Sequence, residues 1–214
     1  MIKLENVDKY FGNYKALKGI NLEVCRGEFI SVMGSSGSGK STLLNIIGGM
    51  DKPEEGIVLV DGEDITAFTD EKLTLYRRSK IGFIFQFFNL LPNITVSENI
   101  SMPLLLKSVE DHPLVMSAIK RIGLYGKEAY YPYQLSGGEQ QRVAIARALI
   151  HDPEIILADE PTGSLDSETG RSIMELIHAL KEERGKTVIL VTHESNIADY
   201  AQRIIYIKDG RIAG

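Results

Sequence analysis

The sequence predicts an α/β fold with an antiparallel β subdomain and an inserted α-helical subdomain. Short apolar runs have the length and composition of buried strands, and they cover residues 29–33, 81–85, 155–158 and 187–192. Residues 2–7 and 20–24 instead alternate apolar and polar side chains, as strands of a half-exposed antiparallel sheet do. Between about residues 87 and 134 apolar residues recur at helical spacing, so we expect a small helical lobe inserted between strands.

Length and composition indicate one globular unit. The 214 residues suffice for a single domain, which we expect to span residues 1–214, with residues 1–86 and 135–214 forming the core around the lobe. A net charge of −5 without a basic tract argues against a nucleic-acid partner. No apolar run is long enough to cross a bilayer, no signal-peptide pattern opens the chain, and the single Cys25 suits a reducing cytosol.

A glycine-rich loop follows the first buried run and fits the phosphate-binding pattern G-x-x-x-x-G-K-[ST]. It consists of Gly34, Ser35, Ser36, Gly37, Ser38, Gly39, Lys40, Ser41 and Thr42. An apolar strand pattern precedes it and apolar residues at helical spacing follow it, which is the context that such a loop requires. A flexible glycine-serine turn would not need both neighbours, so we interpret the segment as a phosphate-binding loop.

Each residue type in this loop has a chemical reason. Glycines allow the backbone to bend so that successive N–H groups surround a phosphate, and the helix that starts near Gly39 directs its positive dipole end at the same anion. Lys40 is expected to contact the β- and γ-phosphates, and the Ser41 hydroxyl is expected to bind Mg²⁺. The loop therefore predicts a nucleoside triphosphate with Mg²⁺.

Two adjacent carboxylates end another buried strand. Asp159 and Glu160 follow the run from Ile155, and acids at a strand's carboxyl end belong beside the phosphate loop of an open α/β sheet. We expect Asp159 to hold Mg²⁺, directly or through water, and Glu160 to polarise the water that attacks the γ-phosphate. Without Lys40 and Ser41 the pair would be interpreted as two solvated acids.

Two further polar residues also end strands. Gln86 follows the run that begins at Ile81, and His193 follows the run that ends at Thr192. A boundary amide and a lone histidine are more often structural. The alternative for Gln86 is contact with a metal or water in front of the phosphates. His193 ends a strand as Gln86 and Asp159 do, which favours a phosphate-sensing role.

A second glycine-rich helix start lies at residues 135–139. Ser136 is a good N-cap, and Gly137 and Gly138 expose backbone N–H groups at the start of an amphipathic helix. An ordinary capped helix explains these residues equally well from physics alone. The alternative is a second anion-binding element in the same chain.

Taken together, these motifs resemble the ATP-binding subunit of ABC transporters along essentially the whole chain. Leu135 to Glu139 is similar to the family signature motif, and Ile155 to Asp159 is similar to its Walker B strand. The resemblance implies a P-loop NTPase core and ATPase activity with ATP and Mg²⁺. It assigns catalytic roles to Glu160, His193, Gln86 and Lys40, nucleotide contacts to Ser136, Gly137, Gly138 and Glu139, and metal contacts to Ser41, Gln86 and Asp159.

The same resemblance identifies the nucleotide-stacking aromatic and two departures. Phe11 falls where the family places the adenine-stacking ring, with Tyr10 as the second choice, although an aromatic residue is more often part of a core. Glu139 stands where the family often has Gln, and Ser164 stands where it often has Ala. Neither position carries the chemistry.

Partners and location follow from the resemblance as well. It implies an ATP-dependent homodimer in which each ATP lies between one chain's phosphate loop and the other's signature motif. It also implies a transmembrane permease partner and a peripheral position on the cytoplasmic side of the membrane. Residues 85–92 and 158–163 look most like the branch that serves lipoprotein release, macrolide export and cell-division complexes.

Several functions share these motifs. An ATPase that powers export or extraction is the leading interpretation, and an ATPase of a mechanotransmission or cell-division complex that moves no substrate is the alternative. A soluble ATPase of DNA repair or translation would need a coiled-coil insertion or a second cassette, and a kinase or GTPase gives no reason for residues 135–139. The sequence does not encode the substrate or the permease.

Overall fold

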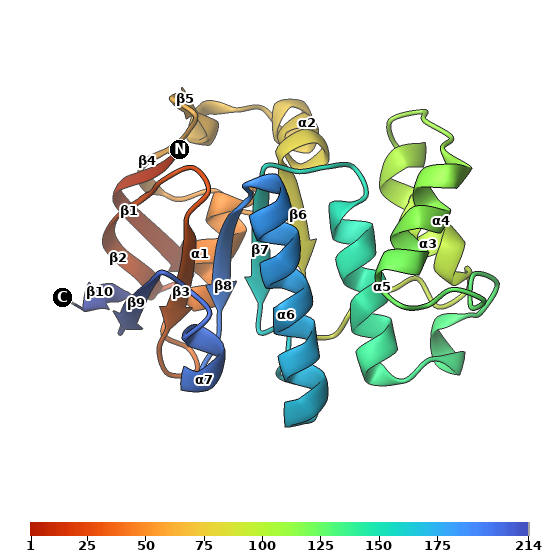
Figure 1. The fold of residues 1–214 in the computed structure, drawn as a ribbon. Coiled ribbons are helices and arrows are strands. Elements are labelled where there is room, and N and C mark those ends of the chain that lie inside the picture. Colours follow the sequence, from red (N-terminus) through yellow and green to blue (C-terminus); the bar gives the residue numbers. More distant parts are fainter. Residues whose placement is uncertain (214) are drawn as a thin grey trace.

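The computed structural model describes residues 1–213, without the side chain of Arg184, and contains two sheets with helices around them (Figure 1). The larger sheet has the strand order β10-β9-β3-β8-β7-β6. Neighbouring strands from β9 to β6 are parallel, and β10 pairs with β9 in the antiparallel sense. The strands are β3 (Phe29–Met33), β6 (Ile81–Ile84), β7 (Ile155–Asp159), β8 (Thr187–Val191), β9 (Arg203–Lys208) and β10 (Arg211–Ala213).

The smaller sheet is antiparallel and has the order β2-β1-β4-β5. Ile2 of the central strand β1 lies opposite Val24 on one side and Val60 on the other. The alternation of apolar residues noted in the sequence places Ile2 and Leu4 in the core. The antiparallel β prediction is therefore confirmed. The strands are β1 (Ile2–Phe11), β2 (Tyr14–Val24), β4 (Glu55–Val60) and β5 (Glu63–Asp64).

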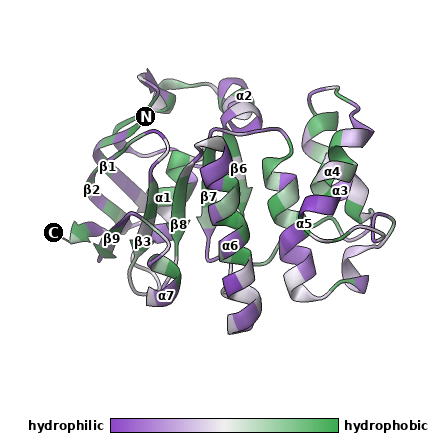
Figure 2. Ribbon diagram, in the orientation of Figure 1, coloured by the Kyte–Doolittle hydropathy of each residue, from purple (hydrophilic) through white to green (hydrophobic). Residues whose placement is uncertain are grey.

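Helices cover both faces of the parallel sheet. Residues of β7 alternate between two apolar clusters, because successive side chains of a strand point to opposite faces. Ile155 and Leu157 pack with α1 and the small sheet, whereas Ile156 and Ala158 pack with α5 and α6. Figure 2 shows the hydrophobic residues concentrated on β3, β7 and β8. The helices are α1 (Lys40–Ile47), α2 (Asp70–Lys80), α5 (Gly137–Leu149), α6 (Ser167–Arg184) and α7 (Ser195–Ala198).

The helical lobe consists of α3 (Val96–Leu105), α4 (His112–Arg121) and the connections around them. Its apolar side chains form their own cluster, and α5 contributes to that cluster as well as to the core of the parallel sheet. Val143 and Ala146 of α5 face the lobe, while Ile145 and Ala148 face the sheet. The proposed boundary near residue 134 thus falls just before a helix that packs on both sides.

Two short elements follow no pattern that the sequence shows. Strand β10 comes after the turn at Asp209 and is too short to give an alternating pattern. Helix α7 has only four residues. Phe11 ends β1, and the turn after it consists of Gly12 and Asn13.

We expect Leu44→Ala to lower the free energy of unfolding by about 2–5 kcal/mol, since a fully buried leucine leaves a cavity when truncated. Leu75→Ala is the matched control, because Leu75 also lies in a helix but is 59% exposed. Its effect should stay within about 0.5 kcal/mol. Urea unfolding of both variants measures the difference, and equal effects would contradict the assigned core.

Candidate functional site

The residues singled out from the sequence lie at one edge of the parallel sheet. The loop 34–39 follows β3, Asp159 is the last residue of β7, and Gln86 and His193 each come two residues after β6 and β8. Parallel strands present their carboxyl ends at the same edge, which is where open α/β sheets bind their ligands. Strand direction therefore gathers side chains that are far apart in the sequence.

The loop needs glycine at two of its positions. A Cβ on Gly34 would lie 2.2 Å from the carbonyl oxygen of Ile207, and a Cβ on Gly39 would lie 2.8 Å from that of Ala16. Gly39 also has a φ of 108°, which L side chains rarely adopt. The loop is thus pressed against β9 and β2, and only a backbone without side chains fits there.

Lys40 and Ser38 turn their polar atoms into the loop. The Lys40 ammonium is almost fully buried and donates to the carbonyl oxygens of Gly34 at 2.8 Å and Ser35 at 3.0 Å. The buried Ser38 hydroxyl has no hydrogen-bond partner among the described residues. Buried polar groups are normally paired, so a cation and an unpartnered hydroxyl in one glycine loop fit an anion. Ser36 is exposed and Thr42 is half-buried.

Ser41 and Asp159 meet across the site. The Ser41 hydroxyl donates to Oδ1 of Asp159 at 3.1 Å. Burial raises the pKa of the Asp159 carboxyl; the hydrogen bond from Ser41 opposes this shift, and the charge of Glu160 adds to it. Adjacent ligands of an octahedral Mg²⁺ at about 2.1 Å lie about 3 Å apart, so these two oxygens fit that ion.

Glu160 and His193 form a second pair beside the first. Oε2 of Glu160 lies 3.2 Å from Nδ1 of His193, and the imidazole is 58% exposed. The Glu160 N–H donates to the carbonyl oxygen of Val191 at 2.9 Å, which ties the residue to β8. Glu160 has a φ of 46°, an uncommon backbone conformation for a residue with a side chain. The backbone thus bends immediately after Asp159, where the two acids separate.

The Gln86 amide and the Glu160 carboxylate both lie close to Gly163. A Cβ on Gly163 would lie 2.9 Å from Nε2 of Gln86 and 3.3 Å from Oε2 of Glu160. The amide and the carboxylate therefore converge at Gly163, and a side chain at this position would fill the space between them. Sequence reasoning missed Gly163, which only its spacing from Glu160 could have indicated.

The second glycine-rich segment starts α5 with a reciprocal cap. The Glu139 N–H donates to the Ser136 hydroxyl at 3.3 Å, and the Ser136 N–H donates to the Glu139 carboxylate at 3.0 Å. Lys127 also pairs with Glu139 and holds its pKa below the usual value. The cap uses the N–H groups of Ser136 and Glu139 and does not involve those of Gly137 and Gly138.

Phe11 is exposed beside the phosphate loop. Its ring is 53% exposed and does not belong to the core, and the Lys9 ammonium lies 5.3 Å from the ring centroid. Tyr14 lies opposite Phe11 in the hairpin and donates its hydroxyl to the carbonyl oxygen of Gly37 at 3.2 Å. Tyr10 is half-buried. Sequence reasoning missed Tyr14, although its place across a two-residue turn from Phe11 was a usable signal.

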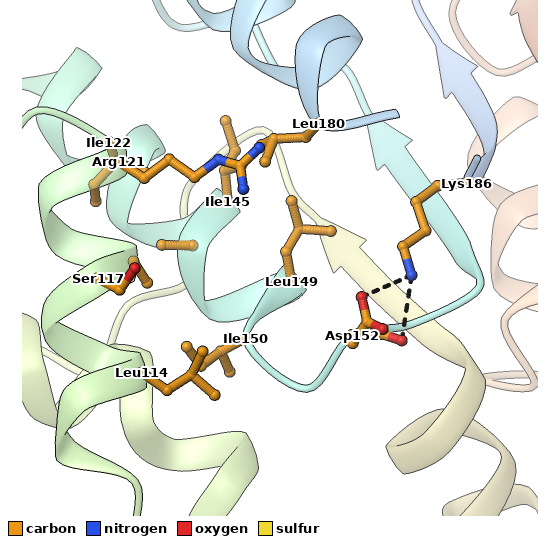
Figure 3. A pocket seen from close by; sticks show the side chains of 12 residues that line it. Leu114, Ser117, Arg121, Ile122, Ile145, Leu149, Ile150, Asp152, Leu180 and Lys186 are labelled. Atoms are coloured by element: carbon orange, nitrogen blue, oxygen red, sulfur yellow. Dashed lines mark hydrogen bonds and ion pairs between the residues drawn. The ribbon is translucent and has the colours of Figure 1, made fainter. Parts of the chain in front are cut away.

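One cavity lies outside the candidate site. A cavity of about 90 Å³ opens between α4, α5 and α6, and none of the described residues that line it belongs to the predicted site (Figure 3). Within residues 1–213 no three His, Cys, Asp or Glu side chains gather as a metal cluster. Mg²⁺ in nucleotide sites commonly uses one or two carboxylates together with phosphate oxygens.

Fold and site together define a nucleotide-binding protein with a phosphate loop on a parallel sheet. The family model described as "ABC transporter" matches residues 17–163. The chain therefore belongs to the ABC transporter family, and within that family it is an ATPase subunit.

Relatives agree over nearly the whole chain. The ABC transporter ATP-binding protein MJ0796 of Methanocaldococcus jannaschii is 52% identical over 99% of this chain and 95% of that protein. Its dimeric structure, a post-hydrolysis state bound to ADP and Pi, superimposes with a TM-score of 0.92 at 49% identity, covering 100% of this chain and 97% of the other. The predicted fold class is thereby confirmed.

Two further relatives point to one branch. The lipoprotein-releasing system ATP-binding protein LolD of Bacteroides thetaiotaomicron is 42% identical over 99% of both chains. The macrolide export ATP-binding/permease protein MacB of Shigella flexneri is 47% identical over 92% of this chain and 31% of that protein. The resemblance to the lipoprotein-release and macrolide-export branch is confirmed. None of the helices described for this chain has the length and apolar character needed to cross a membrane.

Replacing Asp159 by Asn should raise the melting temperature of the nucleotide-free protein at pH 7. The folded-state pKa of Asp159 lies above the unfolded value, so stability falls as the pH rises through this interval. The cost is absent below about 3.9, the ordinary pKa of Asp, and grows as the pH rises above it. The amide side chain introduced by Asp159→Asn carries no charge, and its oxygen can still accept the hydrogen bond from Ser41.

Thermal unfolding at pH 7 and about pH 4.5 measures this effect, and the advantage of Asp159→Asn should shrink at the lower pH. Asp166→Asn is the control, because hydrogen bonds from Thr169 lower the pKa of that carboxyl. The control should not gain stability at pH 7. A loss of stability in Asp159→Asn at pH 7 would contradict the burial argument.

Proposed function

We propose that this chain binds and hydrolyses ATP as the energy-coupling subunit of a membrane export or extraction complex. One observation carries the proposal: the Ser41–Asp159 and Glu160–His193 pairs lie side by side at the end of a phosphate loop. The first pair suits a hydrated Mg²⁺ and the second suits a water that attacks a phosphate. Their combination supports triphosphate hydrolysis over simple nucleotide binding.

ATP binding is assigned to the loop and the hairpin beside it. The N–H groups of residues 34–42 surround the β- and γ-phosphates, and Lys40 leaves its two carbonyl partners to contact them. The Lys9 ammonium lies over the Phe11 ring, 5.3 Å from its centroid. The exposed face of the ring takes the adenine by stacking.

Mg²⁺ binding is assigned to Ser41, Asp159 and Gln86. All three offer oxygen atoms, which this hard cation prefers. When bound, the ion would neutralise charge that develops on the phosphate oxygens during hydrolysis. The raised pKa of Asp159 agrees with a carboxylate that is ionised most easily next to a cation.

Hydrolysis is assigned to Glu160, with His193 and Gln86 beside it. The Glu160 carboxylate accepts a proton from the attacking water, which increases the water's nucleophilicity. His193 lies 3.2 Å from this carboxylate, and the Gln86 amide lies near the same Gly163 that the carboxylate approaches. These neighbours support a fixed position for the carboxylate.

A homodimer is assigned on two grounds. The chain carries two anion-binding helix starts, α1 and α5, and Figure 1 shows α5 beside the lobe rather than beside the phosphate loop. Gly137 and Gly138 of a second copy can donate to the ATP held by the first, so that the nucleotide favours the closed dimer. The dimeric structure of MJ0796 supports this arrangement for a relative that is 49% identical.

A permease partner is assigned from the relatives. MacB is named as both ATP-binding protein and permease, and this chain matches 31% of its length. LolD is named as the ATP-binding protein of a lipoprotein-releasing system. By analogy this chain would act peripherally on the cytoplasmic side of a membrane, with residues 87–134 as a helical subdomain between residues 1–86 and 135–214.

Glu160→Gln should slow ATP hydrolysis by about a hundredfold or more while ATP affinity is retained, because the base is lost and the shape is kept. Steady-state phosphate release and equilibrium ATP binding measure the two quantities. Gel filtration of the variant with Mg²⁺ and ATP should show a dimer.

Glu175→Gln is the matched control, since this exposed glutamate lies on α6 away from the site. It should hydrolyse ATP like the parent protein. Full activity in Glu160→Gln would remove the assigned base, and a monomer at high concentration with ATP would argue against the dimer.

A pull-down identifies the partner. Tagged Glu160→Gln protein with ATP, incubated with detergent-solubilised membranes of the native host, should retain a multi-span membrane protein in stoichiometric amount. Lys40→Ala serves as the control, because a protein that cannot hold ATP should retain less of it. Recovery of soluble proteins or nucleic acid alone would contradict the membrane assignment. A membrane partner without a translocation path would favour a complex that transmits force.

A further inference from the structure

The main chain on both sides of the Gln86 Cα is held by side chains from other elements. The carbonyl oxygen of Phe85 accepts from Nε2 of Gln141 at 3.3 Å, and the carbonyl oxygen of Gln86 accepts from the hydroxyl of Ser164 at 3.0 Å. Both carbonyls lie just past the end of β6, where sheet pairing stops. These two contacts therefore hold the peptide groups on either side of the Gln86 side chain.

Gln141 is the buried one of the two side chains that hold this main chain. Its side chain is fully buried in α5, and Nε2 also donates to the carbonyl oxygen of Pro161 at 2.7 Å. A buried amide is costly to displace once its hydrogen bonds are made. Gln141 therefore joins the residue before Gln86 to the residue after Glu160.

Ser164 lies in the turn after Glu160, and its side chain reaches the main chain of Gln86. The Gly163 N–H donates to the carbonyl oxygen of Glu160 at 3.0 Å, which closes the turn. The Cα of Gly163 faces the Gln86 amide and the Glu160 carboxylate. The next residue, Ser164, is exposed and donates its hydroxyl to the Gln86 main chain.

The backbone beyond Gln86 needs such support. Phe88 and Asn89 have φ angles of 59° and 48°, which are uncommon for residues with side chains. Their carbonyl oxygens accept from Arg147 at 2.9 and 2.6 Å. The segment 85–89 is thus held mainly by side-chain donors, and Ser164 supplies the only one of these donors that comes from the turn carrying Glu160.

We propose that Ser164 is a positioning residue that sets the Gln86 amide beside Gly163, where the Glu160 carboxylate also lies. The hydroxyl acts through the main chain of Gln86, whose carbonyl oxygen accepts from it. Ser164 occupies a position where the family often has Ala, so the contact is a property of this chain. The inference rests on the proposed ATPase function.

Ser164→Ala tests the contact directly. Losing one neutral hydrogen bond should lower kcat about 2–10-fold with little change in ATP affinity. Ser164→Thr keeps the hydroxyl and should restore kcat. Ser172→Ala is the control, because the Ser172 hydroxyl donates to the carbonyl oxygen of Thr169 and accepts from Arg142.

A double-mutant cycle separates positioning from a general structural effect. In a Gln86→Ala background Ser164→Ala should produce no further loss of kcat, because the side chain that it positions is gone. Amide hydrogen exchange by mass spectrometry gives a readout independent of activity. The segment 85–89 of Ser164→Ala should exchange faster than in the parent and in Ser172→Ala.

The outcomes are distinct. If the parent protein binds ATP without hydrolysing it, the proposed function fails, and exchange in the segment 85–89 alone then decides the contact. If the parent hydrolyses ATP and Ser164→Ala matches it in kcat and exchange, the inference is overturned. It is also overturned if the loss of kcat in Ser164→Ala persists unchanged in the Gln86→Ala background.

Discussion

The parallel alignment of β6, β7, β8 and β3 is the constraint on which the site depends. Because all four strands run in the same direction, their carboxyl ends meet at one edge, and each end carries a different polar group. The Ser41–Asp159 hydrogen bond spans this edge between the helix that follows β3 and the end of β7. A reversed strand would remove its polar group to the opposite edge of the sheet.

Most of the fold and the members of the site could be predicted from the sequence, because both depend on local patterns. The strand before Gly34 and the strand before Asp159 are apolar runs of ordinary length, and glycine spacing identifies the loop between strand and helix. The short strand β10 and helix α7 could not be found in this way. They are too brief for a period to show, and β10 depends on pairing with β9.

Contacts between distant segments were beyond sequence reasoning. The position of Tyr14 against Gly37, the approach of Gln86 and Glu160 around Gly163 and the Ser164 contact all depend on tertiary packing. The sequence analysis assigned no part of the chemistry to Ser164. In the structure its hydroxyl donates to the carbonyl oxygen of Gln86, a contact that the residue type alone does not indicate.

The packing of α5 has a mechanical consequence. The helix has 13 residues, and its middle and C-terminal parts are embedded between the lobe and the sheet, while its N-terminal glycines lie at the end. Such a helix is about 20 Å long and moves as a stiff rod, so a pivot of about 3° near its C-terminus displaces the glycines by about 1 Å. That distance is enough to make or break a hydrogen bond to a phosphate. In the proposed dimer, such a motion of the lobe would make or break the anion contact assigned to Gly137 and Gly138.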